Sequence, residues 1–152
     1  MIAYSIDQLL PHAGKMMLLD CVLTYDDESM TAQVTVRGDG LFGDDTGVPA
    51  WLGIEYMAQT VAAHGGLMCR LAGKPLNPGF LLGTRRYYSN VSRFAAGTVL
   101  VVTVKRLIQD QGLGVFDCRV TGDGVEISAK LSVYQPDTAI NRVIYEIKKQ
   151  HE

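Results

Sequence analysis

The chain has 152 residues, of which 47% are hydrophobic and 20% are charged, and its net charge is −2. This length fits one domain with a substantial core, so we expect residues 1–152 to form a single domain. The near-neutral charge, without a long run of Lys or Arg, argues against a nucleic-acid-binding protein.

The first part of the chain predicts a short helix and two strands. Residues 5–10 are typical of a helix with Ser5 as its N-cap, and Pro11 ends it. Residues 16–24 and 30–37 have the apolar or alternating pattern of strands. A loop rich in Gly and Asp then leads to Pro49, a normal signal for the start of a helix.

The long helix predicted over residues 52–69 contains one acidic side chain, Glu55, in an otherwise apolar segment. Burying an ionised carboxylate is expensive, so such a residue is paired, protonated or functional. Gln59 and Ala62 follow by four and seven residues and share its helix face. This face predicts a narrow slot, and the polar residues of the helix argue against a membrane span.

Four more strands are expected after the helix, at residues 80–89, 98–109, 114–121 and 125–135, with a terminal helix at 139–150. Gly122-Asp123-Gly124 predicts a tight hairpin between the last two strands. A helix that is apolar on most sides must be covered, which favours an α+β hot-dog fold, an antiparallel sheet wrapped around one central helix. Since one sheet leaves part of the helix uncovered, we expect a homodimer or a higher homo-oligomer. Gly65-Gly66 either permits another backbone to approach or ends the helix.

Two motifs resemble those of the hot-dog 3-hydroxyacyl-[acyl carrier protein] dehydratases. The segment LPHAGKMMLLD at residues 10–20 resembles their N-terminal L-P-H motif, and GIEYMAQ at 53–59 resembles their central-helix motif. The sequence FLLG at 80–83 resembles the strand that follows that helix. The usual members carry a catalytic His in a G-H-F-P-G loop, whereas the corresponding loop here, GDDTG at 43–47, has none. The whole pattern is more similar to the divergent dehydratases of aryl-polyene biosynthesis.

The resemblance implies dehydration of a 3-hydroxyacyl thioester to the trans-2-enoyl thioester, in fatty-acid-like or aryl-polyene biosynthesis. The substrate would be carried on the phosphopantetheine of acyl carrier protein, the partner that the resemblance implies. Such a reaction needs a base, an acid and hydrogen-bond donors for the enolate oxygen, so we expect no cofactor and no metal.

We expect Glu55 and His12 to form the catalytic pair, His12 as the base and Glu55 as the acid, with the roles interchangeable. His151 lies in the terminal tail, and His64 lies about 180° around the helix from Glu55, which favours a structural role. The alternative for His12 is a bracing hydrogen bond in its loop. In that case an aspartate of the 43–47 loop, Asp44 or Asp45, would replace it.

Four further residues are candidates for substrate binding. Gly53 either offers its backbone N–H to the thioester oxygen or allows close packing, and Gln59 either orients Glu55 or a water or lies on a dimer face. Trp51 either lines the acyl channel or belongs to the core. Arg85 is either near the channel mouth, facing phosphopantetheine or the acidic carrier protein, or a solvated charge.

Two other functions fit the same sequence. A hot-dog thioesterase also uses a helix carboxylate on an acyl thioester but releases a free thiol. A non-catalytic acyl-binding subunit is the second alternative, because the G-H-F-P-G histidine is missing. The cysteines Cys21, Cys69 and Cys118 form no CxxC pair, and residues 1–12 lack the apolar run of a signal peptide. We therefore expect a cytoplasmic protein.

Overall fold

The computed structural model describes residues 4–10, 16–136, 147 and 149–150. The predicted terminal helix at 139–150 therefore lies mostly outside the described residues, as do His12 and His151. Along the chain the elements are α1 (Ile6–Leu9), β1 (Cys21–Tyr25), β2 (Ser29–Thr35), β3 (Gly47–Pro49), the 3-10 turn η2 (Ala50–Leu52), α2 (Gly53–Leu71), β4 (Phe80–Ser89), β5 (Arg93–Ala95), β6 (Val99–Asp110), β7 (Leu113–Gly122) and β8 (Val125–Tyr134).

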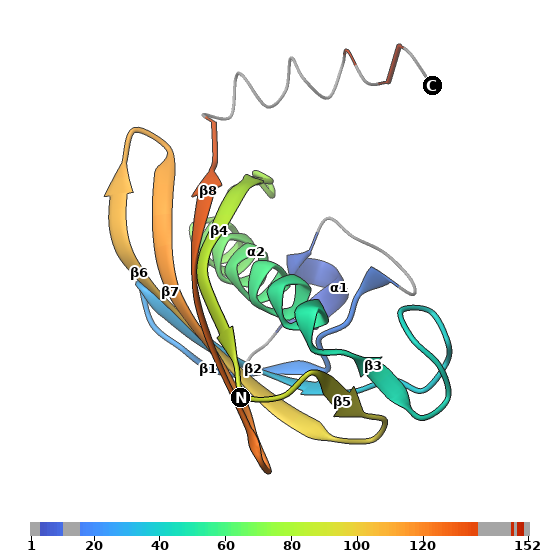
Figure 1. The fold of residues 1–152 in the computed structure, drawn as a ribbon. Helices are drawn as coiled ribbons and strands as arrows, with labels where there is room; N and C mark the ends of the chain where they lie inside the picture. Colours follow the sequence, from blue (N-terminus) through green and yellow to red (C-terminus); the bar gives the residue numbers. More distant parts are fainter. Residues whose placement is uncertain (1–3, 11–15, 137–146, 148, 151–152) are drawn as a thin grey trace.

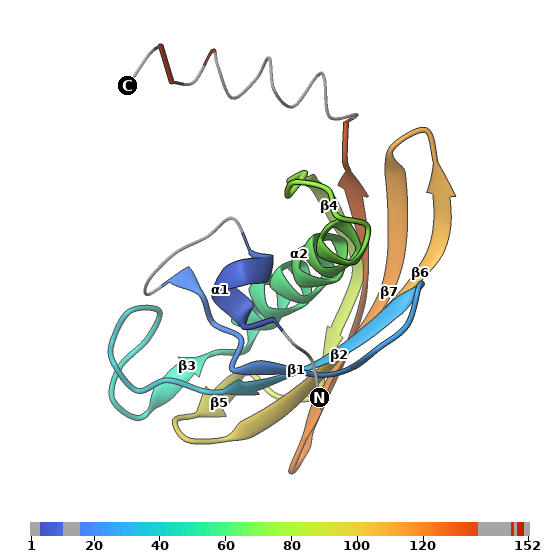
Figure 2. The same cartoon turned by 180° about the vertical axis from the view of Figure 1, so that it is seen from behind.

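An antiparallel six-stranded sheet, in the order β1-β2-β6-β7-β8-β4, curls around α2 (Figures 1 and 2). The strands β6 and β7 alternate between buried and exposed residues, so one face of the sheet packs on the helix. The short strands β3 and β5 pair with each other beside the start of α2. The predicted α+β hot-dog fold is confirmed.

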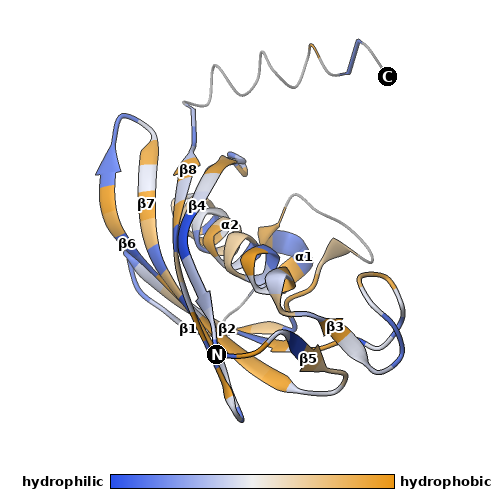
Figure 3. Ribbon diagram, viewed as in Figure 1, coloured by the Kyte–Doolittle hydropathy of each residue, from blue (hydrophilic) through white to orange (hydrophobic). Residues whose placement is uncertain are grey.

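The helix α2 packs its apolar side on the sheet and on α1, and its central residues are coloured as hydrophobic in Figure 3. Tyr56, Met57, Ala63 and Leu67 are buried. The helix continues to Leu71, so the two glycines do not end it. A Cβ at Gly66 would lie 2.0 Å from the carbonyl oxygen of Leu9, whereas one at Gly65 would meet nothing within 4 Å. Close backbone approach therefore explains Gly66 but not Gly65.

Two sequence predictions need correction. The predicted first strand at 16–24 is shorter in the structure, because β1 begins at Cys21 and backbone groups of residues 16–18 bond to a helix side chain instead. The strands β3 and β5 were not predicted, since three residues are too few to show an alternating pattern. The predicted β7–β8 hairpin is confirmed: Gly122 pairs with Val125, and Gly124 has the positive φ of +70° that such a turn requires.

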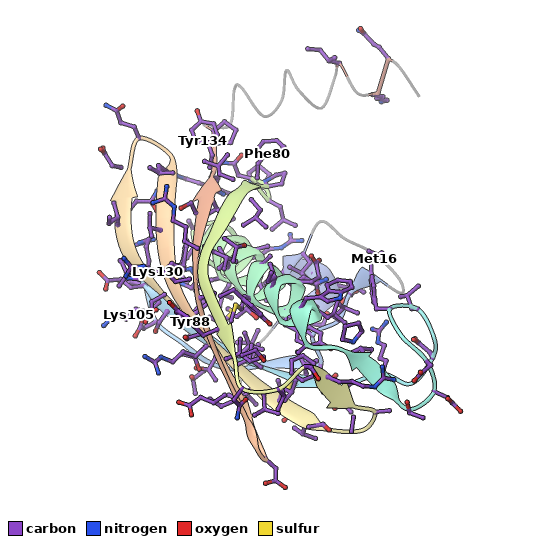
Figure 4. The ribbon with its side chains drawn as sticks, in the orientation of Figure 1. Met16, Phe80, Tyr88, Lys105, Lys130 and Tyr134 are labelled. Carbon is purple, nitrogen blue, oxygen red and sulfur yellow. The ribbon has the colours of Figure 1, made fainter. Side chains whose placement is uncertain are left out.

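The strand β4 is an edge strand of the sheet: among the described residues it is hydrogen-bonded to one neighbouring strand, β8. Several of its apolar side chains are exposed, including Leu81, Leu82 at 60% and Tyr88 at 68%. Figure 4 labels Phe80 and Tyr88 near the two ends of this strand. Within the described part of the chain, no helix is long and apolar enough to cross a membrane.

Candidate active site

Glu55 lies in the first turn of α2, half-buried, at the side of a groove of about 500 Å³. We call this space the α2 groove. Its volume is in the range of small-molecule sites. On the helix it is lined by the small residues Ala58, Ala62 and Gly65, and opposite them by residues of the loop after α2 and of β4, β6, β7 and β8, among them Leu76, Leu81, Arg106, Phe116 and Val133.

A buried amide holds the Glu55 carboxylate in place. The Nε2 atom of Gln59 donates to Glu55 Oε1 at 3.0 Å and to the carbonyl oxygen of Met16 at 2.6 Å. Its Oε1 atom accepts the backbone N–H of Leu18 at 2.9 Å, which fixes the orientation of the amide. One oxygen of Glu55 is thus engaged, and Oε2 makes no hydrogen bond with the described residues.

The same amide attaches segment 16–18 to the helix beside Glu55, and Figure 4 shows Met16 on this segment. Arg37 adds a second attachment, because its Nη2 donates to the carbonyl oxygen of Met17. Leu18 is buried in the core. Segment 16–18 is therefore fixed beside Glu55 at the start of the helix.

The structure places the other predicted binding residues outside the α2 groove. The backbone N–H of Gly53 is directed to the carbonyl oxygens of Ala50 and Trp51 in the 3-10 turn, and its missing Cβ would lie 2.7 Å from the hydroxyl of Tyr87. Of the two alternatives for Gly53, these contacts support close packing. Trp51 is 59% exposed rather than in a channel or in the core. Arg85 is exposed on β4, opposite Lys130 on β8.

The loop that replaces the usual histidine loop is braced by Asp44. The carboxylate accepts hydrogen bonds from the side chain and N–H of Thr46 and from the N–H of Gly47, and it forms an ion pair with Arg93. The bond from the Thr46 hydroxyl, above all, lowers the pKa of Asp44 from its ordinary value. Neither Asp44 nor Asp45 lines the α2 groove.

His64 is 2% exposed and lies at the opposite side of the α2 groove from Glu55. Its Nε2 is 2.9 Å from the carbonyl oxygen of Asp26, in the turn between β1 and β2. Burial lowers the pKa of His64 from its ordinary value, partly offset by this hydrogen bond. The described residues contain no group of three His, Cys, Asp or Glu that fits a metal ion.

Comparison with known protein families identifies the family of this chain. The sequence model of the ApeP-like family, described as ApeP dehydratase, matches residues 4–144. The chain belongs to the ApeP-like dehydratase family. A chain of the dehydratase heterocomplex ApeI:P from Xenorhabdus doucetiae has a TM-score of 0.83 and 31% identity to this ApeP-like protein, with 94% of this chain and 99% of that chain covered.

More distant structures share the fold. The PaaI protein from the phenylacetic acid degradation operon of E. coli has a TM-score of 0.57 and 13% identity, covering 75% of this chain and 81% of its own. A hypothetical thioesterase with coenzyme A from Streptococcus pneumoniae has a TM-score of 0.55 and 13% identity, covering 76% and 87%. At this identity the likeness shows the hot-dog fold alone. None of the curated proteins compared with the chain matches it.

Proposed function

We propose that this ApeP-like protein dehydrates a 3-hydroxyacyl thioester on acyl carrier protein to the trans-2-enoyl thioester, in the biosynthesis of an aryl polyene. The observation that carries the proposal is the Glu55 carboxylate, held by Gln59 at the side of the α2 groove in a chain of a dehydratase family. The relation to the ApeI:P heterocomplex supports the pathway.

Glu55 exchanges a proton with the substrate through Oε2, because Oε1 accepts the hydrogen bond from Gln59. As the acid, it protonates the 3-hydroxyl group, which leaves as water. A second group removes the proton from the carbon next to the thioester carbonyl, and the electron pair of that C–H bond forms the new double bond. Both steps are proton transfers, so we propose that the reaction needs no metal and no organic cofactor.

His12 is proposed as the second group. It precedes Met16 by four residues, and an extended chain of four residues spans at most about 14 Å. Met16 and Leu18 are themselves attached to Gln59 beside Glu55. This chain length supports the proposal that His12 acts together with Glu55.

The carrier protein is proposed to bind beside β4. Arg85 and Lys130 are cross-strand neighbours, and their two positive charges fit an acidic partner. The phosphopantetheine arm would pass from this surface over β4 to the α2 groove, which Leu81 of the same strand lines. Charge reversal at Arg85 is expected to raise KM for the acyl carrier protein while sparing a thioester of pantetheine alone.

We also propose that β4 pairs with a second hot-dog subunit. An exposed, apolar edge strand is a template for pairing with another strand. On β4 the side chains of Leu81, Leu82 and Tyr88 are exposed to solvent. A second copy of this chain gives the homodimer expected from the sequence. The alternative partner is a different but related subunit, because the similar chain from Xenorhabdus doucetiae is part of the heterocomplex ApeI:P.

The product distinguishes the proposed dehydratase from its rivals. A 3-hydroxyacyl carrier protein is incubated with the wild type and with His12→Ala, and acyl chain and free thiol are both measured. The proposal predicts an enoyl thioester without free thiol, and a loss of about 100-fold or more in rate for His12→Ala. Released thiol would show a thioesterase, and an unchanged substrate would show a non-catalytic subunit. Full activity of His12→Ala would exclude His12 as the base.

A further inference from the structure

His64 is a polar side chain that lines the α2 groove, and the proposed reaction does not use it. Its side chain is almost completely buried, yet it lines the groove together with Val61, Met68 and Arg106. One ring nitrogen, Nε2, is hydrogen-bonded to the carbonyl oxygen of Asp26. The other, Nδ1, makes no hydrogen bond with any residue that the structure describes.

The chemistry of Nδ1 follows from the bond made by Nε2. A carbonyl oxygen accepts only, so Nε2 carries the hydrogen and donates it to Asp26. Burial lowers the pKa of His64, which keeps the ring neutral at pH 7. The Nδ1 atom then carries a lone pair and no hydrogen, so it can accept one hydrogen bond but cannot donate one.

The groove connects this lone pair with Glu55 across the helix. His64 lies nine residues after Glu55, a rise of about 14 Å and a rotation of about 180°. Between them on the helix surface are Ala58, Ala62 and Gly65, which also line the groove. A Cβ at Gly65 would meet nothing within 4 Å, so packing within the chain does not explain this glycine. The small residues leave an open path from the carboxylate to the histidine.

We propose that His64 is a specificity-determining residue, whose Nδ1 accepts a hydrogen bond from a neutral O–H or N–H donor of the substrate lying in the α2 groove. The inference rests on the proposed function, because it takes the acyl thioester as the groove's ligand. Two parts of such a substrate carry suitable donors. One is a hydroxyl group on the distal part of the acyl chain, and the other is an amide N–H of the pantetheine arm.

Binding of unreactive analogues tests the inference without turnover. Saturated acyl pantetheine thioesters lacking the 3-hydroxyl group are titrated calorimetrically in matched pairs. One pair differs by a hydroxyl group at the far end of the acyl chain, and the other by methylation of the amide nitrogens. We expect the wild type to favour the donor-bearing member of one pair by about fivefold to tenfold, and the pair that responds identifies the source of the donor.

Two substitutions separate recognition from folding. Gln places its amide nitrogen near the position of Nε2, so His64→Gln keeps the donor to Asp26 and removes the Nδ1 acceptor. Asn places its amide near Nδ1, so His64→Asn keeps an acceptor there and loses the bond to Asp26. We expect the preference to disappear in His64→Gln and to persist in His64→Asn, although His64→Asn is the less stable variant.

Two outcomes would overturn the inference: no preference in either pair for the wild type, or a preference that survives in His64→Gln. Neither depends on catalysis. If the wild type dehydrates its substrate but shows no preference, the proposed function stands and the role of His64 falls. If the preference is present and no water is lost from a 3-hydroxyacyl substrate, His64 recognition stands and the dehydratase assignment falls.

Discussion

At the scale of single residues, Gln59 explains the geometry of the site better than any other side chain. Its three hydrogen bonds join Glu55, Met16 and Leu18, which lie on two separate segments of the chain. The residue is fully buried, so water cannot replace these bonds. It fixes one carboxylate oxygen and places the segment that follows His12.

Replacing Gln59 by Leu should destabilise the fold and reduce activity together. The N–H of Leu18 and the carbonyl of Met16 would lose their partner, and leaving the buried Leu18 N–H unsatisfied costs about 1–3 kcal/mol. We expect the free energy of unfolding in urea to fall by about 2 kcal/mol or more. The control is Gln109→Leu, an exposed position. Equal stability of the two variants would show that the Gln59 bonds contribute nothing.

The sequence predicted that Gln59 shares the helix face of Glu55, because this depends on spacing within one helix. It did not predict that Gln59 bonds to the backbone of segment 16–18, since that contact joins residues more than 40 positions apart. Nor did it predict what the backbone N–H of Gly53 contacts. A 3-10 turn precedes the helix and already uses that group.

At the scale of elements, α2 combines a closely packed side with an open side. Both Gly65 and Gly66 line the groove, but at Gly66 the Leu9 carbonyl of α1 leaves no room for a Cβ, whereas at Gly65 the space is empty. Periodicity predicted the helix and its apolar character correctly. The sequence could not distinguish the two adjacent glycines, because the difference lies in what each one faces.

The two glycines should respond in opposite directions to the same substitution. Gly66→Ala is expected to destabilise the protein by about 2 kcal/mol or more, because α1 must move away. Gly65→Ala should stabilise it by up to about 1 kcal/mol, since Ala is the better helix former and the space is empty. Chemical unfolding of both variants measures this. A stable Gly66→Ala protein would contradict the packing of α1 on α2.

His64 should make stability depend on pH. Its pKa in the folded state is lowered from 6.5, so near that pH the unfolded chain binds more protons than the folded one. The free energy of unfolding should therefore be undiminished above about pH 7 and decrease as the pH falls through 6.5 toward the lowered pKa. The free energy of unfolding is measured between pH 5 and 8 for the wild type and for His64→Gln. The same pH dependence in both proteins would contradict the prediction.

At the scale of the whole molecule, the sheet curls around the helix and ends in two edge strands, β1 and β4. The hot-dog arrangement could be predicted from the order of strands and from the need to cover an apolar helix. The place of β4 at an edge of the sheet could not, because β4 follows α2 in the sequence but pairs with the last strand, β8. Pairing between such distant segments leaves no local pattern.

Disrupting β4 should separate the proposed subunits. Leu82→Asp introduces a charge at an exposed apolar position and is expected to leave the fold intact. Light scattering after size exclusion should give the mass of a dimer for the wild type and of a monomer for the variant. Leu107→Asp, an exposed apolar position on β6, is the control and should remain dimeric. If the wild type is a monomer and assembles only with a related dehydratase subunit, the proposed homodimer is wrong and β4 forms a heterodimer instead.

The most direct test of the central claim is the mass of the acyl chain after reaction, measured for the wild type and for Glu55→Gln. Gln preserves the shape of the side chain but cannot exchange the proton. We expect loss of one water from the 3-hydroxyacyl group with the wild type, and a rate lower by about 100-fold to 10,000-fold for the folded variant. Water loss at the same rate in Glu55→Gln would contradict the assignment of Glu55 as the catalytic carboxylate.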